Sequence, residues 1–313
     1  MSPRRRRKDA PGPAGFLVVD KPVGWTSHDV VDAARRWLGI RRVGHLGTLD
    51  PRATGALPLA IREATKLAPF LAKGRKVYVG SIRLGVATDT YDGEGKVTHR
   101  HDGPLPSEKE VRAVLGEFLG AIQQVPPMFS SVKKDGVPLY RLARRGEEVE
   151  REARPVEIHS IEMPHYAPPE IGIEVTCSPG TYVRTLAHEV GQRLGCGAHL
   201  SALRRTASGP FSLDQARVPE ECERLAQAGE LSGALMAPAD ALGLPRVQLT
   251  AIQARRVTHG GDIPVAEASG EFERGPAPRP GDRLAALAPS GTLLAVMELK
   301  PDRRLHPLRV LSG

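Results

Sequence analysis

The chain has 313 residues, of which 40% are hydrophobic and 4% aromatic, enough for one large domain with its own core and a smaller second domain. No apolar run is long enough to span a bilayer, and the basic start leads into Asp, Pro and Gly rather than into the apolar segment of a secretory signal. The three cysteines, Cys177, Cys196 and Cys222, have no C-x-x-C spacing, which argues against a zinc site or a disulfide framework and favours the reducing cytoplasm.

The net charge of +8 points toward a nucleic-acid partner, but half of it lies in one short segment. Residues 1–14 carry five cations and one acid, a balance of +4 that leaves only +4 for the rest of the chain. We predict a disordered basic tail that adds weak attraction for phosphates. A targeting address and a purely solubilising segment are the alternatives.

A short buried strand is predicted at residues 16–19, followed by a turn and a helix with Ser27 as its N-cap. Gly39 ends this helix, whose apolar face consists of Val30, Val31, Ala34, Trp37 and Leu38. Next come a strand at 56–61, a helix at 63–72 and an alternating strand over 76–88, in which Val77, Val79, Ile82 and Leu84 are apolar.

Ser107 and Glu110 form a capping box at the start of a helix with the apolar stripe Val111, Val114, Leu115, Phe118 and Leu119. A strand at 171–177, a helix at 181–195 closed by Gly195, and an Ala-rich helix over 218–242 follow. Pro245 marks a boundary, after which short strand candidates lie between Gly- and Pro-rich turns. The order predicts an α/β (α+β) protein with a mixed sheet, a loop-rich insertion at about 121–156 and a small β-rich C-terminal domain.

Asp50 is the single carboxylate of the stretch "RRVGHLGTLDPRATGALPLA", residues 41–60. An Asp before a Pro is ordinarily a turn residue or a helix cap. Here Gly44 and Gly47 permit a ligand to approach the backbone, and Arg184 in "GTYVRT" also stands at a turn that leads into a helix. A carboxylate that faces an arginine stays ionised and oriented, as a nucleophile or base requires. Spacing alone does not establish that the two residues meet.

Several other kinds of site have no support in the sequence. There is no carboxylate pair of the glycosidase type in the Asp50 loop, no G-x-G-x-x-G after a strand and no phosphate loop, so we expect no nucleotide cofactor. "HRHD" at residues 99–102 is better interpreted as a solvated loop than as a metal pair, and His188 as a structural or surface residue. We expect no metal. Tyr78 is interpreted either as a core residue or as a platform on which a base stacks.

Five segments in order resemble the bacterial tRNA pseudouridine synthase B family. They are "DKPVGWTSHDVV", "GHLGTLDPRATGALPLA", "KVYVGSIRLGVATDTYDGEG", "QVPPMFSSVKKDGVPLYRLARRGEEVE" and "GTYVRTLAHEVGQRLGCGAHLSALRRTASGPF". The resemblance implies a pseudouridine synthase fold with a largely antiparallel central sheet over residues 15–243. It also implies a PUA-like RNA-binding domain over 244–313, although that region resembles the family more weakly.

The resemblance further implies that a uridine in the tRNA T-arm, at conventional position 55, is isomerised without cofactor, guide RNA or obligatory protein partner, by a monomer. Asp50 matches the catalytic aspartate, Arg184 the arginine paired with it and Tyr78 the tyrosine that stacks on the base. The further matches around the flipped uridine are His45, Tyr182, Leu203 and the Lys21-Pro22 motif. Leu46, Ile61 and Arg62 depart from the usual family residues, and Arg62 stands where Gly is usual.

Seven cations in the insertion and after the predicted 181–195 helix are candidate contacts for the RNA backbone, or else a solvated charged face: Lys133, Lys134, Arg141, Arg144, Arg145, Arg204 and Arg205. Two alternative functions remain open. One is a non-catalytic RNA-binding or RNA-folding module, which would leave the set of Asp50, Tyr78 and Arg184 unexplained. The other is a guide-RNA-dependent pseudouridine synthase.

Overall fold

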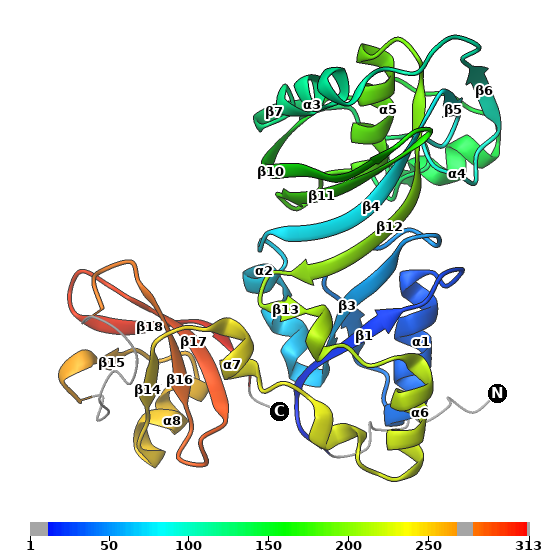
Figure 1. Cartoon of the computed structure of the whole chain (residues 1–313). Helices are drawn as coiled ribbons and strands as arrows, with labels where there is room; N and C mark the ends of the chain where they lie inside the picture. The colour runs from blue at the N-terminus through cyan, green and yellow to red at the C-terminus, as the bar shows by residue number, and fades with distance from the viewer. Residues whose placement is uncertain (1–11, 268–277, 312–313) are drawn as a thin grey trace.

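The computed structural model describes residues 12–267 and 278–311, so the predicted disordered tail at 1–14 falls almost entirely outside the described residues. A mixed, largely antiparallel sheet forms the centre of the larger part of the molecule (Figure 1). Its order is β1-β3-β12-β4-β11-β10-β7, with β2 beside β3 and β13 beside β12. These strands are β1 (Gly15–Lys21), β2 (Val43–His45), β3 (Thr54–Ile61), β4 (Lys76–Leu84), β7 (Gly120–Gln124), β10 (Arg154–Ala167), β11 (Glu170–Cys177), β12 (Ala198–Ser208) and β13 (Phe211–Ser212).

The β3–β12 pair is parallel, whereas the other pairs described within this sheet are antiparallel. The two strands approach so closely that a Cβ on Gly55 would lie 2.3 Å from the Arg205 carbonyl oxygen, and Gly55 has a φ of 102°. Glycine is therefore needed where the start of β3, just after the Asp50 loop, joins the middle of the sheet. The predicted fold class, a mixed and largely antiparallel sheet with helices, is confirmed.

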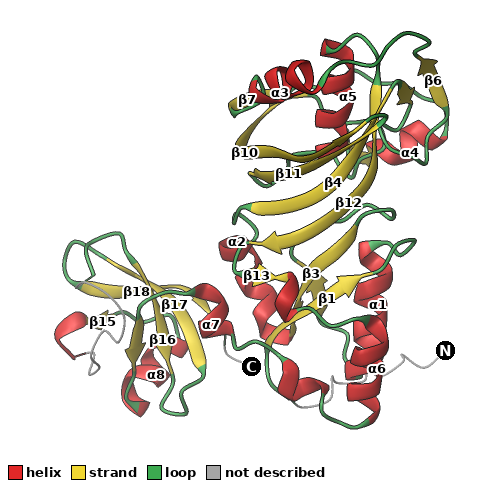
Figure 2. Cartoon of the chain, viewed as in Figure 1, coloured by secondary structure: helices red, strands yellow, loops and turns green. Residues whose placement is uncertain are grey.

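The sheet is covered on both faces at its β1–β3 end, where the strands are apolar on both sides. In β1, Leu17 and Val19 belong to one core cluster, while Phe16 and Val18 belong to the other. The first cluster packs against α1 (Ser27–Leu38), α3 (Glu108–Gly116), α5 (Val183–Arg193) and α6 (Pro219–Gln227). The second packs against η1 (Arg62–Leu67), α2 (Ala68–Leu71) and α7 (Pro238–Leu242). Figure 2 shows the helices lying on either side of the strands.

The predicted start of the first helix is wrong by one residue. Thr26 is the N-cap of α1, and its side chain accepts a hydrogen bond from Asp29 N–H in a capping box. The Ser27 hydroxyl instead faces inward. Gly39 ends α1 in the left-handed conformation, as predicted, with φ 64°. The predicted capping box of Ser107 and Glu110 is also present, at the start of α3.

Two predicted helices are broken into shorter pieces. The segment 63–72 is the 3-10 turn η1 followed by the four-residue α2. The segment 218–242 contains α6, the 3-10 turn η3 (Leu231–Ala234) and α7 instead of one helix. Gly229 (φ 74°) lies between α6 and η3, and Pro238 is the first residue of α7, so both interrupt a continuous helix. Arg62, the first residue of η1, adopts a φ of 56°, a left-handed conformation at the position where the resemblance made Gly the usual residue.

A second, five-stranded sheet follows in the order β14-β16-β17-β18-β15. It comprises β14 (Arg246–Gln248), β15 (Ile263–Pro264), β16 (Arg283–Leu287), β17 (Leu293–Leu299) and β18 (Arg304–Val310), with α8 (Ala251–Thr258) packed against it. It lies to one side of the main sheet, beyond α7 (Figure 1). It is joined to the larger part through Val296 and Leu311, which pack in the same cluster as Phe16, and through Arg283, which lies over the Phe70 ring.

The predicted insertion at 121–156 begins and ends within strands of the main sheet, β7 and β10. Between them lie the β8–β9 hairpin (Lys133–Lys134 and Val137–Pro138) and α4 (Leu139–Arg144). A second hairpin, β5–β6 (Val86–Thr88 and Val97–Arg100), leads into the loop that faces α5. In the part of the chain that the structure describes, no helix has the length and apolar character needed to cross a membrane.

Candidate active site

Asp50 lies in the loop between β2 and β3, and buried polar contacts fix this loop on both sides of the aspartate. The Ser27 hydroxyl donates to the Leu49 carbonyl (3.0 Å) and accepts from the Leu49 N–H (2.8 Å). Lys21 donates to three carbonyl oxygens, one of them that of Pro51 at 3.1 Å. The residues before and after Asp50 are thus both attached to the protein interior, which restricts where its carboxylate can point.

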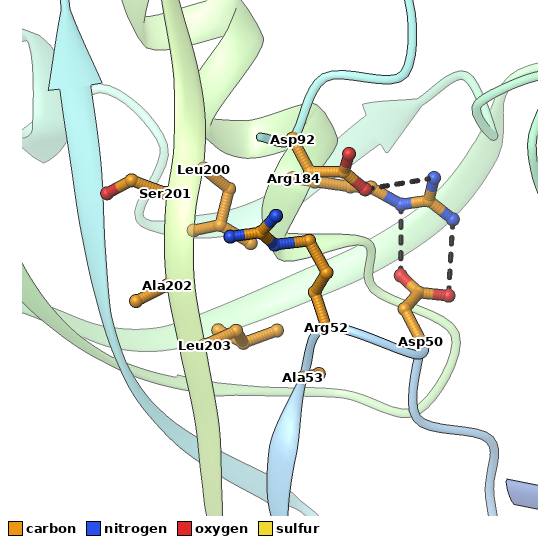
Figure 3. A pocket seen from close by; sticks show the side chains of 9 residues that line it. All are labelled: Asp50, Arg52, Ala53, Asp92, Arg184, Leu200, Ser201, Ala202 and Leu203. Carbon is orange, nitrogen blue, oxygen red and sulfur yellow. Dashed lines mark hydrogen bonds and ion pairs between the residues drawn. The ribbon is translucent and has the colours of Figure 1, made fainter. Parts of the chain in front are cut away.

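The Asp50 carboxylate faces the guanidinium of Arg184, so the structure brings together the two residues whose meeting spacing could not establish (Figure 3). Nε of Arg184 is 3.1 Å from one carboxylate oxygen, and Nη2 donates to the other at 3.3 Å. Asp92 provides a second carboxylate, 3.8 Å from Nη1. The guanidinium also donates to the carbonyl oxygens of Thr90 (3.4 Å) and Phe129 (2.5 Å). Arg184 is 4% exposed, and its neighbours leave it little freedom.

Asp92 was not predicted as a site residue. It lies 42 residues after Asp50 in a loop with the ordinary turn composition "DTYDGEG", and nothing in its spacing distinguishes it from a turn aspartate. Its side chain also accepts from the Thr90 hydroxyl and from the Glu94 N–H. These contacts orient the second carboxylate toward Arg184.

Two opposing effects act on the protonation of Asp50. Partial burial, the larger effect, raises the pKa of the Asp50 carboxyl, and the nearby Asp92 adds to the rise. Arg184 and, more weakly, Lys21 lower this pKa. The Asp50 side chain is 41% exposed because it opens onto the pocket, so solvent also favours its charged form. Arg184 is the main protein group that keeps this carboxylate ionised.

Lys21, predicted to contact substrate, is fully buried beneath the loop that carries Asp50. Its ammonium already donates to the carbonyl oxygens of Pro22, Trp25 and Pro51. Burial lowers the pKa of Lys21 to about 8. The geometry gives this lysine a positioning role for Asp50.

The prediction that Arg205 contacts the RNA backbone is wrong, because this residue is only 1% exposed. Its guanidinium donates to the carbonyl oxygens of Ala56 (2.8 Å), Thr48 (3.3 Å) and Gly47 (3.2 Å). It therefore ties β12 to the loop that carries Asp50. The arginine was misassigned because burial of a cation by backbone carbonyls leaves no mark in the local sequence.

Tyr78 is 8% exposed and lies on the face of β4 that packs into the first core cluster. Burial raises the pKa of its hydroxyl, an effect that the neighbouring Arg205 partly offsets. His45, in β2, has a buried Nδ1 without a hydrogen-bond partner among the described residues, and burial and Arg205 lower its pKa. The stacking role of Tyr78 and the base-linked role of His45 stay predictions.

Tyr182 is the residue before α5, and its ring lies 5.8 Å from the Arg184 guanidinium carbon. The buried Gln124 of β7 fixes it, because the Gln124 side chain accepts from Tyr182 N–H (2.8 Å) and donates to its carbonyl (3.1 Å). Leu203 lines the pocket at Asp50. The pocket is lined by Asp50, Arg52, Ala53, Asp92, Arg184, Leu200, Ser201, Ala202 and Leu203.

Five of the predicted RNA-backbone cations are exposed and belong to the insertion. This basic insertion surface comprises Lys133, Lys134, Arg141, Arg144 and Arg145. Arg204 differs from them because it is only partly exposed, and its guanidinium forms an ion pair with Asp20 at 2.7 Å. The short link between Phe129 and Arg184 places the base of the insertion directly against the Asp50–Arg184 pair.

The two histidine predictions fare as follows. His101 of the "HRHD" segment lies 3.2 Å from the Pro104 carbonyl oxygen, and no group of three or more potential metal ligands occurs among the described residues. His188 stacks on Tyr91, with ring centroids 3.9 Å apart and an interplanar angle of 19°. His188 is therefore a structural residue that packs α5 against the loop carrying Asp92.

The sequence matches two family descriptions across most of the larger part. Residues 35–183 match "TruB family pseudouridylate synthase (N terminal domain)", and residues 184–239 match "tRNA pseudouridylate synthase B C-terminal domain". A protein of Geobacter sulfurreducens named tRNA pseudouridine synthase B is 48% identical over 285 residues, which covers 91% of this chain and 93% of that protein. The chain belongs to the TruB family of pseudouridylate synthases.

Other TruB relatives extend the match to nearly the full chain. A protein of Ralstonia pickettii, also named tRNA pseudouridine synthase B, is 43% identical over 303 residues and covers 93% of this chain and 94% of its own length. Among solved structures, a chain of a Cbf5-Nop10-Gar1 complex superposes with a TM-score of 0.70 at 27% identity, covering 96% of this chain and 85% of that one. A chain of an H/ACA RNP bound to a substrate RNA containing 2'-deoxyuridine gives 0.69 at 25% identity, covering 96% and 85%.

Proposed function

We propose that the chain is a stand-alone tRNA pseudouridine synthase that isomerises the T-arm uridine at conventional position 55. The observation that carries the proposal is the Asp50–Arg184 pair, a pocket-facing carboxylate held by both of its oxygens in a chain of the TruB family. The named relatives, tRNA pseudouridine synthases B at 43–48% identity, support tRNA as the substrate.

The reaction breaks the bond between N1 of uracil and C1′ of ribose, rotates the base and joins C5 to C1′. Product and substrate are isomers, so the chemistry requires no redox step and no group donor. Asp50 is the residue that acts on the nucleoside, either by attack on the sugar or base or by assisting elimination. Arg184 keeps the carboxylate ionised and aimed, which is what a nucleophile or base at neutral pH needs.

A uridine in a folded T-loop cannot reach Asp50 unless it leaves its stack, so we infer that the enzyme flips the base. Tyr78, Tyr182 and Leu203 would then face the extruded nucleotide, and His45 would lie near the position that the base enters. Stacking on a tyrosine ring offsets part of the lost base stacking. This arrangement accounts for several apolar and aromatic residues around one carboxylate.

The basic insertion surface is proposed to bind phosphates of the T-arm. Its five exposed cations lie next to the segment that contacts Arg184 through Phe129. Affinity for a T-arm stem-loop should fall steeply with salt, by about 0.7–0.9 in log–log slope for each phosphate that is neutralised. A flat salt dependence would show that this surface is only a solvated charged face.

Residues 244–313 are proposed to be a PUA-like domain that helps to hold the RNA. The five-stranded sheet and its own apolar cluster support a separate unit, although Val296 and Leu311 also pack against the larger part. Truncation after residue 243 should therefore give a folded but less stable enzyme with weaker RNA binding. Failure of this truncated chain to fold would place the boundary inside a shared core.

Two other functions are distinguished by one experiment. The solved neighbours include chains of guide-RNA assemblies by their titles, and a non-catalytic RNA-binding module would also use a basic surface. Purified protein and an unmodified tRNA transcript labelled with tritium at uridine C5 should release tritium with no guide RNA or second protein. Release only after a guide RNA is added, or binding without release, would contradict the proposal. The proposal also includes a cytoplasmic location, where tRNA is found, and a monomeric enzyme.

A further inference from the structure

The pocket beside Asp50 is too small for the base that the proposed function requires. Its cavity is about 20 Å³, room for about one water molecule. A uracil ring is several times larger than a water molecule. One of the groups that line the pocket must therefore move before a nucleotide can enter.

The polar lining groups differ in how firmly they are held. Asp50, Arg184 and Asp92 are linked by ion pairs, and the single Ser201 hydroxyl proton has two acceptors within reach, the Glu170 carboxylate at 2.6 Å and the Ser81 carbonyl at 3.0 Å. Leu200, Ser201, Ala202 and Leu203 all belong to β12, whose backbone is paired within the sheet. The ion pairs and hydrogen bonds make the polar groups poor candidates for movement, and the pairing of β12 holds its backbone in place.

Arg52 is the exception among these polar lining residues. Its side chain is exposed, it follows Pro51 in a turn, and it has neither an ion pair nor a hydrogen bond with the described residues. A Cβ on Gly93 would lie 3.7 Å from the Arg52 guanidinium carbon, so this group rests against the Gly93 backbone. Figure 3 shows Arg52 extending away from Asp50 and across the pocket toward Leu200.

Arg52 also changes the net charge of the pocket. The two carboxylates and Arg184 sum to −1, which repels an approaching polyanion, and Arg52 brings the sum to zero. A guanidinium without a partner at the mouth of such a pocket is suited to bind a phosphate through two parallel hydrogen bonds. Only side-chain rotations are needed for it to leave the pocket.

We propose that Arg52 is a gate for the uridine pocket. In the free protein its side chain lies across the pocket, and on RNA binding its guanidinium swings out to a backbone phosphate beside the flipped nucleotide. The same movement makes room for the base and exchanges the contact of the guanidinium with solvent for an ion pair with the phosphate. The gate rests on the proposed function, since it assumes that a uridine enters this pocket.

The gate predicts that Arg52→Ala changes the affinity for two ligands in opposite directions. A T-arm stem-loop loses a charge-assisted phosphate contact worth about 30- to 100-fold in affinity but shares the gain from an open pocket, so its dissociation constant should rise by about tenfold, and the log–log salt slope should fall by about 0.7–0.9. Free uridine carries no phosphate and no longer has to displace the side chain, so it should bind about three- to tenfold more tightly. Arg52→Lys, which keeps the charge, should restore the salt slope.

The stem-loop is followed by fluorescence anisotropy over a salt series, and uridine by ligand-observed NMR, so neither readout requires turnover. Arg224→Ala is the matched control, because Arg224 is an exposed arginine on α6, outside the pocket, and should change neither affinity. Weaker stem-loop binding with unchanged uridine binding would overturn the gate and leave a simple phosphate contact. Unchanged binding of both ligands would overturn any role for Arg52. A wild-type protein that makes no pseudouridine in tRNA would instead refute the proposed function.

Discussion

Replacing Arg184 by lysine tests whether a charge alone is enough to support Asp50. The guanidinium contacts both Asp50 oxygens, at 3.1 and 3.3 Å, and two carbonyl groups. An ammonium has a point charge and no planar fork, so at least one contact to Asp50 is lost. One hydrogen bond to a charged group is worth about 1.5–3 kcal/mol. If that energy is expressed in the transition state, the rate falls by about 10- to 150-fold.

The assay is single-turnover formation of pseudouridine in a T-arm stem-loop, with affinity measured separately. Arg184→Lys should bind the stem-loop with the wild-type affinity and react more slowly. Arg193→Lys is the control on the same helix, because Arg193 pairs with Glu117 at the surface. A wild-type rate for Arg184→Lys would refute the inference that two-point contact positions Asp50.

The pH dependence of a second variant separates charge from geometry. Arg184→Gln removes the cation that lowers the Asp50 pKa, while burial and Asp92 still raise it. More of the carboxylate is then protonated at low pH, so activity should be lost there and recover as the pH rises through the new pKa. Arg184→Lys keeps the cation and should lack this recovery. A pH profile of Arg184→Gln with the same shape as that of the wild type would show that Arg184 does not control the ionisation of Asp50.

Three further predictions concern buried polar side chains. Burial lowers the Lys76 pKa from 10.5 to about 8, so the unfolded chain binds more protons between these values and the free energy of unfolding should rise with pH across them. In urea denaturation, Lys76→Met should reduce that rise and stabilise the fold at pH 7 by about 1–3 kcal/mol; an unchanged slope would contradict the assignment. Arg205→Ala should destabilise by about 3–5 kcal/mol, because three carbonyl groups lose their donor, and thermal unfolding at the wild-type temperature would contradict this. Tyr78→Phe should retain stacking while losing any proton transfer through the hydroxyl, and Tyr78→Leu should lose both; single-turnover rates separate them, and normal turnover of Tyr78→Leu would restore the core interpretation.

Apolar periodicity predicted four strands of the main sheet, β1, β3, β4 and β11, but missed the long strands β10 and β12 and did not show which face of each strand is buried. In β4 the buried face carries Lys76, Tyr78, Ile82 and Leu84, whereas Val79 is 42% exposed. The four apolar residues of this segment are Val77 and Val79, on one face of the strand, and Ile82 and Leu84, on the other, so they indicated no single buried face. The buried Lys76 and Tyr78 are polar residue types and did not resolve this. What fixes the face is the pairing of β4 between β11 and β12, which is not a local property.

Some residues of the site could also be predicted from the sequence, and others could not. Asp50 and Arg184 stood out through their residue types and the family motifs around them, and they lie together as predicted. Asp92 was not predicted and Arg205 was wrongly assigned to the RNA backbone, because an aspartate in a turn and an arginine in a basic pair have ordinary sequence contexts. Their roles depend on contacts across many residues, with Arg184 for Asp92 and with the Asp50 loop for Arg205.

The most direct test of the central claim is pseudouridine formation by Asp50→Asn on an unmodified tRNA transcript, beside its binding curve. Asparagine keeps the size of the side chain and removes its negative charge, and the loop stays attached through Ser27 and Lys21. We predict that the variant folds, binds the transcript at least as tightly as the wild type and forms no pseudouridine. Formation of pseudouridine by Asp50→Asn at a rate near that of the wild type would contradict the account.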